Sequence, residues 1–315
     1  MAEPIFEKHD RAMHGRPVVG YAMVAVAATL FGINGTVSKV VLGSGISSLR
    51  LTEVRCAGAV IGLGLLAVAV APARVRTTRR ELPLLVLFGV AGVAFVQLFY
   101  FLAIHRLPIG IALLIQYLGP LLIALWARYV DHEAVRRRIW IALVLALAGL
   151  AMMIEIWTGV SLDAAGIGAA LASAVVFAFY VLFAERAVAG RDSITLLAWG
   201  FLFATLFWSV VQPWWSFPAA RVARTVSLAG HLHELHLPVW ALVLWVIVLG
   251  TIVPFILVVG ALRHISATRA AVTAMLEPVV ATLVAWLWLG ERLSAVQLTG
   301  AAVVLAGIVV AQTAR

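Results

Sequence analysis

Residues 267–290 read ATRAAVTAMLEPVVATLVAWLWLG. A run of this length can cross the hydrocarbon core of a bilayer as a helix, which takes about 20 apolar residues. Its one acidic residue, Glu277, stands near the middle and is followed by Pro278. An ionisable residue is costly at that depth, and a proline removes a helical hydrogen bond and frees a carbonyl. The stretch therefore predicts an interrupted membrane helix with a polar group at its centre.

The rest of the chain has the same apolar character. Of its 315 residues, 64% are hydrophobic and 12% are charged, and the mean hydropathy is +1.08. Soluble domains are less apolar and carry about twice as many charges. About 200 apolar residues are enough for about ten membrane helices. We therefore expect an all-α polytopic membrane protein.

Ten apolar stretches can be drawn as candidate membrane helices. They cover residues 18–41, 48–71, 82–104, 109–129, 139–158, 164–186, 193–215, 238–262, 268–289 and 294–313. The first sixteen residues mix acidic and basic side chains without a cleavage-site pattern, which favours a cytosolic tail over a signal peptide. Most connections are short, and the longest, 216–237, carries three histidines but no cluster typical of a metal site.

The distribution of basic residues orients these helices. The net charge is +9, from 23 Lys and Arg against 14 Asp and Glu. With both termini in the cytoplasm, 16 of the 23 basic residues fall on the cytoplasmic side, as the positive-inside rule requires. The excess charge thus reflects membrane topology and does not indicate nucleic-acid binding. The single cysteine, Cys56, permits no intramolecular disulfide.

The sequence contains an internal repeat. An offset of 158 aligns Gly92 with Gly250 and Pro120 with Pro278. The same offset aligns Glu133 with Glu291, while an offset of 146 aligns Asn34 with Tyr180. We therefore expect two five-helix halves, 17–158 and 163–313, after a tail at 1–16. Because five is odd, the halves have inverted topology, which is typical of transporters that alternate access to a central site.

Seven side chains inside the predicted helices are candidates for that site. They are Asn34, Gln97, Tyr100, Gln116, Tyr117, Tyr180 and Glu277. Polar groups in membrane helices face the bundle interior, where they either join helices or line a site, and the pattern leaves both roles open. For Glu277, the sequence also leaves open a purely structural role, in which a neutral carboxyl group stabilises the helix kink. Helix kinks are expected at Pro120, Pro254 and Pro278.

Charged residues near the helix ends suggest a gate. Lys39, Glu53 and Arg55 could form ion pairs that open and close, although snorkelling explains them as well. Arg50 and Glu53 are three residues apart and could pair on one helix. Glu133 and Glu291 precede candidate helices and are expected to cap them.

These residues resemble a known family. Residues 261–311, with EP at 277–278 and GERL at 290–293, closely resemble the C-terminal repeat of EamA-type members of the drug/metabolite transporter superfamily. The first half is similar, and its QYLGP at 116–120 resembles the threonine/homoserine exporter branch. The resemblance implies a ten-helix secondary carrier of the bacterial inner membrane. It also implies a cavity between the first, third, fourth, sixth, eighth and ninth helices, which carry the seven candidates.

The expected function is therefore export of amino acids or related small metabolites, without a cofactor and with protons as a candidate coupling ion. Efflux of lipophilic cations or drugs is the alternative. A membrane-embedded enzyme or scaffold is more remote, because the chain has no P-loop, GxSxG or HExxH motif and no paired acids within a span.

Overall fold

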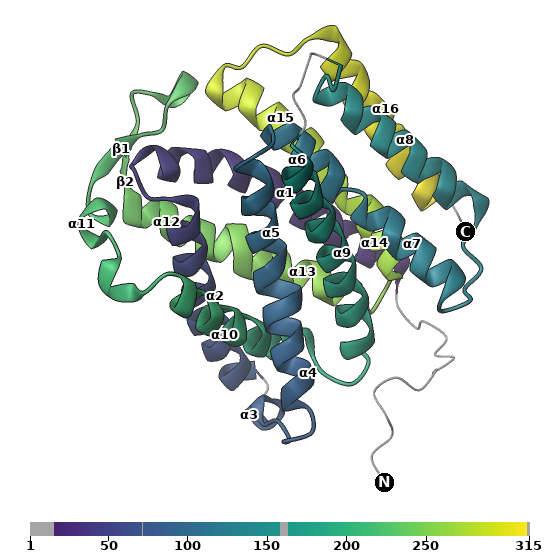
Figure 1. The fold of residues 1–315 in the computed structure, drawn as a ribbon, viewed down its shortest axis with the longest axis horizontal. Helices are drawn as coiled ribbons and strands as arrows, with labels where there is room; N and C mark the ends of the chain where they lie inside the picture. Colours follow the sequence, from purple (N-terminus) through teal and green to yellow (C-terminus); the bar gives the residue numbers. More distant parts are fainter. Residues whose placement is uncertain (1–15, 71, 158–162, 314–315) are drawn as a thin grey trace.

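The computed structural model describes residues 16–70, 72–157 and 163–313, so all of the predicted tail except Arg16 lies outside the described residues (Figure 1). The first half contains α1 (Pro17–Gly43), α2 (Ser48–Val70), α3 (Pro72–Val75), α4 (Leu82–Leu87), η1 (Phe88–Ala94), α5 (Phe95–Ile104), α6 (Ile109–Gln116), α7 (Gly119–Tyr129) and α8 (Arg137–Met153). The second contains α9 (Ala164–Ala187), α10 (Ser193–Val211), η2 (Trp214–Ser216), α11 (Ala219–Val222), β1 (Thr225–Ser227), η3 (Gly230–Leu232) and β2 (His236–Pro238). It continues with α12 (Val239–Ile247), η4 (Val248–Ile252), α13 (Val253–Ala261), α14 (Ala267–Ala274), α15 (Leu276–Val284), η5 (Ala285–Leu289) and α16 (Ala295–Gln312).

Nine helical segments within the described ranges are long and apolar enough to cross a membrane. They are Pro17–Gly43, Ser48–Val70, Leu82–Ile104, Ile109–Tyr129, Ala164–Ala187, Ser193–Val211, Val239–Ala261, Ala267–Leu289 and Ala295–Gln312. Large apolar side chains remain exposed on their outer faces, as Ile61, Leu65 and Val68 are on α2. Such a face suits lipid, and the predicted helical, polytopic class is confirmed.

The remaining candidate, 139–158, is shorter than expected. Here α8 has 17 residues and ends at Met153, which gives it a length of about 26 Å against a hydrocarbon core of about 30 Å. Apolar residues continue beyond it, but Glu155 has a φ of 49°, and a left-handed residue ends a helix. The Glu155 carboxylate accepts a hydrogen bond from the Ser294 hydroxyl at 2.5 Å, which ties the end of α8 to the start of α16. The count of ten spans stays a prediction.

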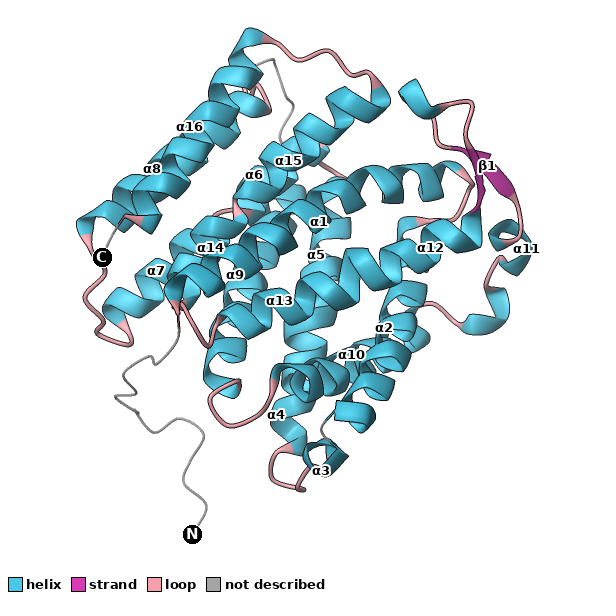
Figure 2. Ribbon diagram, turned by 180° about the vertical axis from the view of Figure 1, so that it is seen from behind, coloured by secondary structure: helices cyan, strands magenta, loops and turns pink. Residues whose placement is uncertain are grey.

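The two terminal helices of the halves pack against each other along their length (Figures 1 and 2). They run antiparallel and touch through glycines, because a Cβ on Gly149 would overlap the backbone of Gly300 and one on Gly307 would meet the Ala142 carbonyl. Small residues at such contacts let two membrane helices approach closely. These contacts are reciprocal under the 158-residue offset, since Gly300 corresponds to Ala142 and Gly307 to Gly149.

The two halves also have irregular helical turns at corresponding positions. The π-helical segments η1 and η4 lie at corresponding places in the two halves, each inside a membrane helix. The helix pair α1 and α15 also has its counterpart in α9 and α7, and both pairs are in contact.

The long connection between α10 and α12 folds over one end of the bundle, where Figure 2 shows the strands beside α11. Strands β1 and β2 pair antiparallel, with Val226 opposite Leu237. The Trp288 indole donates to the Leu228 carbonyl at 2.9 Å, and His231 Nδ1 lies 3.0 Å from the Leu287 carbonyl. This connection is therefore anchored to η5.

Candidate functional site

Two membrane helices are interrupted at corresponding positions. The segment 109–129 breaks between α6 and α7, so that Pro120 is the second residue of α7. The segment 267–289 breaks at Met275, so that Pro278 is the third residue of α15. Each break creates a half-helix N-terminus, whose free N–H groups and dipole favour negative charge. The third predicted kink, Pro254, follows the π-helical turn η4.

The residues at the two breaks meet. Tyr117 follows the last residue of α6, and its phenol lies beside the carboxylate of Glu277 in the first turn of α15. Tyr117 and Leu276 also pack against the same buried cluster, which includes Met275. The two breaks are therefore close to each other, and a carboxyl group lies at their meeting point.

Two further candidates lie beside this pair, and a third stands one turn from one of them. Tyr100 on α5 is close enough to interact electrostatically with both Glu277 and Tyr117. Gln97 stands one turn earlier on α5 and is half-buried. Gln116 ends α6 next to Tyr117, and its side-chain carbonyl is buried without a hydrogen-bond partner in the described protein.

Asn34 belongs to a second contact region around η4. It is 8% exposed, and its side-chain amide lies against Gly250, where a Cβ would collide with it. Two residues earlier on α1, Gly32 lies against Val280 and Ala281 of α15. Helix α1 therefore runs from the η4 turn to the half-helix that carries Glu277.

Tyr180 occupies the corresponding place in the other half. Its ring lies beside Gly92 of η1, stacks on Phe88 at a centroid distance of 5.5 Å and meets Phe255 edge-on at 6.0 Å. It is 6% exposed, and its hydroxyl has no partner in the described protein. Buried polar groups are nearly always hydrogen-bonded, so Tyr180, Asn34 and Gln116 are chemically suited to contact a polar solute.

The three proposed gate residues do not form one network. Lys39 Nζ donates to Glu291 Oε1 at 2.8 Å and joins the end of α1 to the turn before α16. Glu53 is fully buried and pairs with Arg50 at 2.7 Å, while Arg50 also donates to the Pro213 carbonyl. Arg55 lies on the same helix, and its Nε has no partner in the part of the chain described.

The capping prediction for the two glutamates is wrong. Ser294 caps α16 by a capping box with Gln297, and Glu291 instead accepts a hydrogen bond from Lys39. Residue Arg136 precedes α8 without a side-chain cap.

At the positions of the other half that correspond to Lys39 and Glu291, both residues are acidic. Under the repeat offsets, Lys39 corresponds to Glu185 and Glu291 to Glu133. The Glu185 carboxylate accepts the Ala267 N–H at 2.6 Å. Burial and the neighbouring Asp131 raise the pKa of Glu133, although the charge of Arg186 acts against them. Arg186 itself donates to both oxygens of Asp131 at 2.8 Å. One end of the bundle thus has an ion pair where the other has two carboxylates.

The residues near the site whose role could not be predicted from the sequence are mostly apolar. The repeat marks Gly92 and Gly250, but their role in receiving Tyr180 and Asn34 depends on how the helices cross. Phe31 and Phe255 meet edge-on at 5.6 Å beside Tyr180. Phenylalanines in an apolar helix carry no signal of a site.

Comparison with known proteins identifies relatives over most of the chain. The EamA-like transporter family matches twice, over residues 18–155 and 164–313. The threonine/homoserine exporter RhtA of Escherichia coli K12 is 29% identical over 265 residues, which cover 83% of this chain and 79% of that protein. An uncharacterized transporter of Archaeoglobus fulgidus is 28% identical over 93% of this chain and 96% of its own length.

Two other matches agree. The uncharacterized inner membrane transporter YicL of Salmonella typhimurium is 23% identical over 92% of this chain and 94% of its own length. A crystal structure of another protein superposes with a TM-score of 0.72 over 93% of this chain and 95% of that chain, at 18% identity. At that identity the match shows a shared fold.

Proposed function

Because this chain belongs to the EamA-like transporter family, and is a transmembrane transporter, we propose that it exports amino acids or related small metabolites. The proposal takes its substrate class from RhtA, which is named as a threonine/homoserine exporter. The observation in the structure that supports it is the proximity of Tyr117 and Glu277, which lie at the breaks of two membrane helices. For this proposal, Glu277 supplies an acid, Tyr117 a phenol and the adjacent Gln116 an amide.

The mechanism we propose is alternating access between two inverted five-helix halves, 17–158 and 163–313. The two separate matches to the family support this division. Reciprocal contacts support it as well, because Asn34 lies against Gly250 as Tyr180 lies against Gly92. Both termini are proposed to be cytoplasmic, in agreement with the arginine distribution. The bacterial inner membrane is the proposed location.

Each site residue has a chemical role in this proposal. The Glu277 carboxylate receives the ammonium group of a zwitterionic solute or, in its absence, a coupling proton. Gln97, Gln116 and Asn34 hydrogen-bond the remaining polar groups. The half-helix N-terminus of α7 lies close to the same place, and its positive end favours the solute carboxylate.

Export is tested by comparing small molecules in the medium of bacterial cells that express the wild type, Glu277→Gln or empty vector. Glu234→Gln is the matched control, since Glu234 is exposed in the long connection. We expect amino acids such as threonine or homoserine to accumulate outside with the wild type and the control only. Accumulation with Glu277→Gln at the wild-type level would remove this residue from the mechanism. No accumulation with any variant would contradict export of these solutes.

Efflux of lipophilic cations is the second candidate, because aromatic rings surround Tyr180. Phe255 contacts Phe31, Tyr180 and Phe201 with ring centroids 5.0 to 6.0 Å apart. Aromatic faces attract organic cations. Resistance of expressing cells to cationic dyes would favour this function over amino-acid export. Transport by purified protein in liposomes would exclude the remote alternative of an enzyme or scaffold without transport activity.

A further inference from the structure

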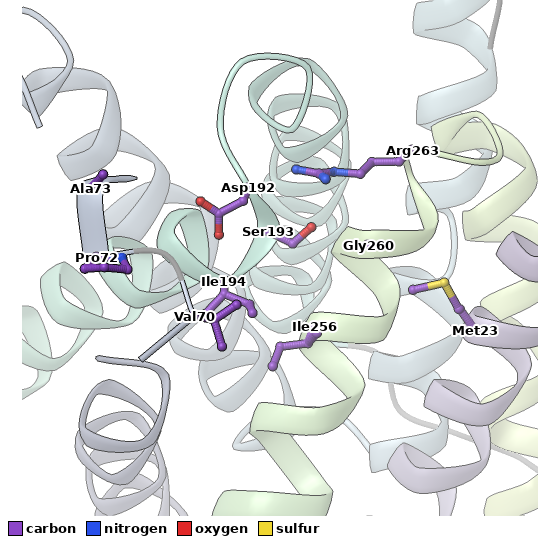
Figure 3. A pocket seen from close by; sticks show the side chains of 10 residues that line it. All are labelled: Met23, Val70, Pro72, Ala73, Asp192, Ser193, Ile194, Ile256, Gly260 and Arg263. Atoms are coloured by element: carbon purple, nitrogen blue, oxygen red, sulfur yellow. The ribbon is translucent and has the colours of Figure 1, made fainter. Parts of the chain in front are cut away.

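A pocket of about 610 Å³ opens between the ends of four membrane helices (Figure 3). Its lining comes from α1, the end of α2 with α3, the start of α10, and α13 with the turn after it. None of the seven candidate site residues lines it. The volume is within the range of pockets that bind small molecules.

Most of the lining is apolar. Met23, Val70, Ile194 and Ile256 form the inner wall, and Gly260 leaves room between α13 and α1. Met23 is six residues from the start of α1, and Ile256 is five residues from the end of α13. At 1.5 Å per residue, the pocket reaches about 8 to 9 Å into the spanning helices. That depth corresponds to the boundary between head groups and acyl chains.

The polar side chains gather on one side of the pocket, where Figure 3 shows Arg263, Asp192 and Ser193. The Arg263 guanidinium donates from one nitrogen to the Arg191 carbonyl at 3.2 Å, and no carboxylate of the described ranges lies within ion-pair distance of it. Asp192 is occupied by capping α10, because it accepts the Thr195 N–H at 2.9 Å and the Thr195 hydroxyl at 2.6 Å. Arg263 is therefore an exposed cation at the mouth of the pocket, without a carboxylate partner among the described residues.

The chain around this mouth is basic. Arg191 bonds the Arg76 carbonyl at 3.3 Å and thereby holds the loop between α3 and α4 against α10. The loop between α3 and α4 carries Arg76, Arg79 and Arg80, while Arg191 stands just before α10 and Arg263 follows α13. The acidic residues of the same described segments are Asp192 and Glu81, and Glu81 is paired with Arg191 at 2.9 Å. The surroundings attract anions that approach from the membrane surface.

We propose that this pocket binds an anionic phospholipid, with its phosphate on Arg263 and the start of an acyl chain along Met23, Val70 and Ile256. An apolar slot that opens at head-group depth beside an arginine without a carboxylate partner matches the two parts of such a lipid. The proposal does not depend on the solute that the protein transports, since none of the seven candidate site residues lines this pocket.

Native mass spectrometry of the purified full-length protein in detergent tests this site. Phosphatidylglycerol is the anionic probe, and phosphatidylethanolamine is the probe without net charge. The variants are Arg263→Gln, which removes the cation, and Ala73→Trp, which fills the mouth from an exposed position. Arg292→Gln is the matched control, because Arg292 lies in the turn before α16 and does not line the pocket. We expect the wild type and the control to retain phosphatidylglycerol in preference to phosphatidylethanolamine.

Arg263→Gln should weaken phosphatidylglycerol binding about fivefold, the effect of one arginine near a membrane surface. Ala73→Trp should weaken it while the charge is kept, which tests the apolar slot separately. Equal retention of phosphatidylglycerol by the wild type and Arg263→Gln would overturn the proposal. Equal binding of the two lipids by the wild type would overturn it too. In a thermal-shift measurement, stabilisation by inorganic phosphate as strong as by the lipid would show an anion site and overturn the lipid assignment.

Discussion

Asn34 of α1 packs its side-chain amide directly against Gly250, within the π-helical turn η4. A side chain at residue 250 would occupy the space that the amide fills. The corresponding contact in the other half, between Tyr180 and Gly92, is looser, because a Cβ at residue 92 would lie 3.5 Å from the tyrosine ring. In both halves a side chain therefore packs against a glycine of a π-helical turn, although asparagine and tyrosine differ in size.

Gly250→Ala should destabilise the protein by about 1 to 3 kcal/mol, because the added methyl overpacks the contact with Asn34. The double variant Gly250→Ala with Asn34→Ala should regain most of the lost stability, although it lacks the amide for transport. Thermal unfolding in detergent measures both. Gly64→Ala is the control, since a Cβ at that position meets nothing within 4 Å. Equal destabilisation of the single and double variants would contradict a direct steric contact.

Tyr117→Phe should slow transport about tenfold with little change in folding. The variant removes the phenol hydroxyl that lies beside the Glu277 carboxylate, and losing a contact with a charged group costs about 1.5 kcal/mol or more. Solute export from proteoliposomes is the measurement. Tyr129→Phe is the matched control, because Tyr129 is exposed at the far end of α7. Unchanged export by Tyr117→Phe would separate the tyrosine from the mechanism.

Reversing the charge of Lys39 should weaken the tie between α1 and the turn before α16. Both partners are exposed, with 65% and 49% of their side chains accessible, so the loss of stability should be at most about 1 kcal/mol. Lys39→Glu combined with Glu291→Lys should restore it. Thermal unfolding at low and high salt checks the pair, because salt screens an exposed ion pair and should reduce the difference. A double variant as unstable as the single one would show that the pairing has no effect.

Stability should depend on the ionisation of Glu81, which lies before α4 outside the membrane helices. Burial alone would raise its pKa, but hydrogen bonds from the Thr78 N–H and the Thr77 hydroxyl and the charge of Arg191 lower that pKa below its ordinary value. The ionised carboxylate therefore stabilises the folded protein above the unfolded-state pKa of about 4.3. That stabilisation is lost as the pH falls through the lower folded-state pKa.

Glu81→Gln should accordingly be less stable than the wild type at pH 7, and the difference should shrink as the pH falls below about 4. Thermal unfolding across this range measures it, with Glu234→Gln as a control that should follow the wild type. A difference that grows with acidification would reverse the sign of the coupling between Glu81 and its partners.

Local features of the fold were accessible from the sequence. The apolar runs located the helices, and the prolines at 120 and 278 marked the helix breaks. The three-residue spacing of Arg50 and Glu53 anticipated their ion pair, which the structure contains at 2.7 Å. The resemblance to the transporter family was confirmed by two matches over nearly the whole chain. Each of these depends on neighbours along the chain or on spacing within one helix.

Contacts between distant segments could not be predicted in the same way. The pair Lys39–Glu291 joins residues 252 positions apart, and its formation depends on how α1 crosses α15. The end of α8 at Met153 also escaped prediction, because the residues after it are still apolar and a tertiary bond from Ser294 helps to turn the chain. Hydropathy does not distinguish a helix that ends from one that continues.

The connection from α10 to α12 occupies 212–238, whereas its counterpart from α2 to α4 in the first half occupies 71–81. The longer connection is fastened to η5 through Trp288 and His231 and reaches the turn after α1, where Arg221 donates to the Gly45 carbonyl. Under alternating access, opening the end of the bundle at 212–238 has to break these contacts. The connection at the opposite end, 71–81, is shorter. The two access states of the carrier then differ in free energy even without a solute gradient. Under that mechanism the resting population would be biased toward one side, and shortening the connection would shift that bias.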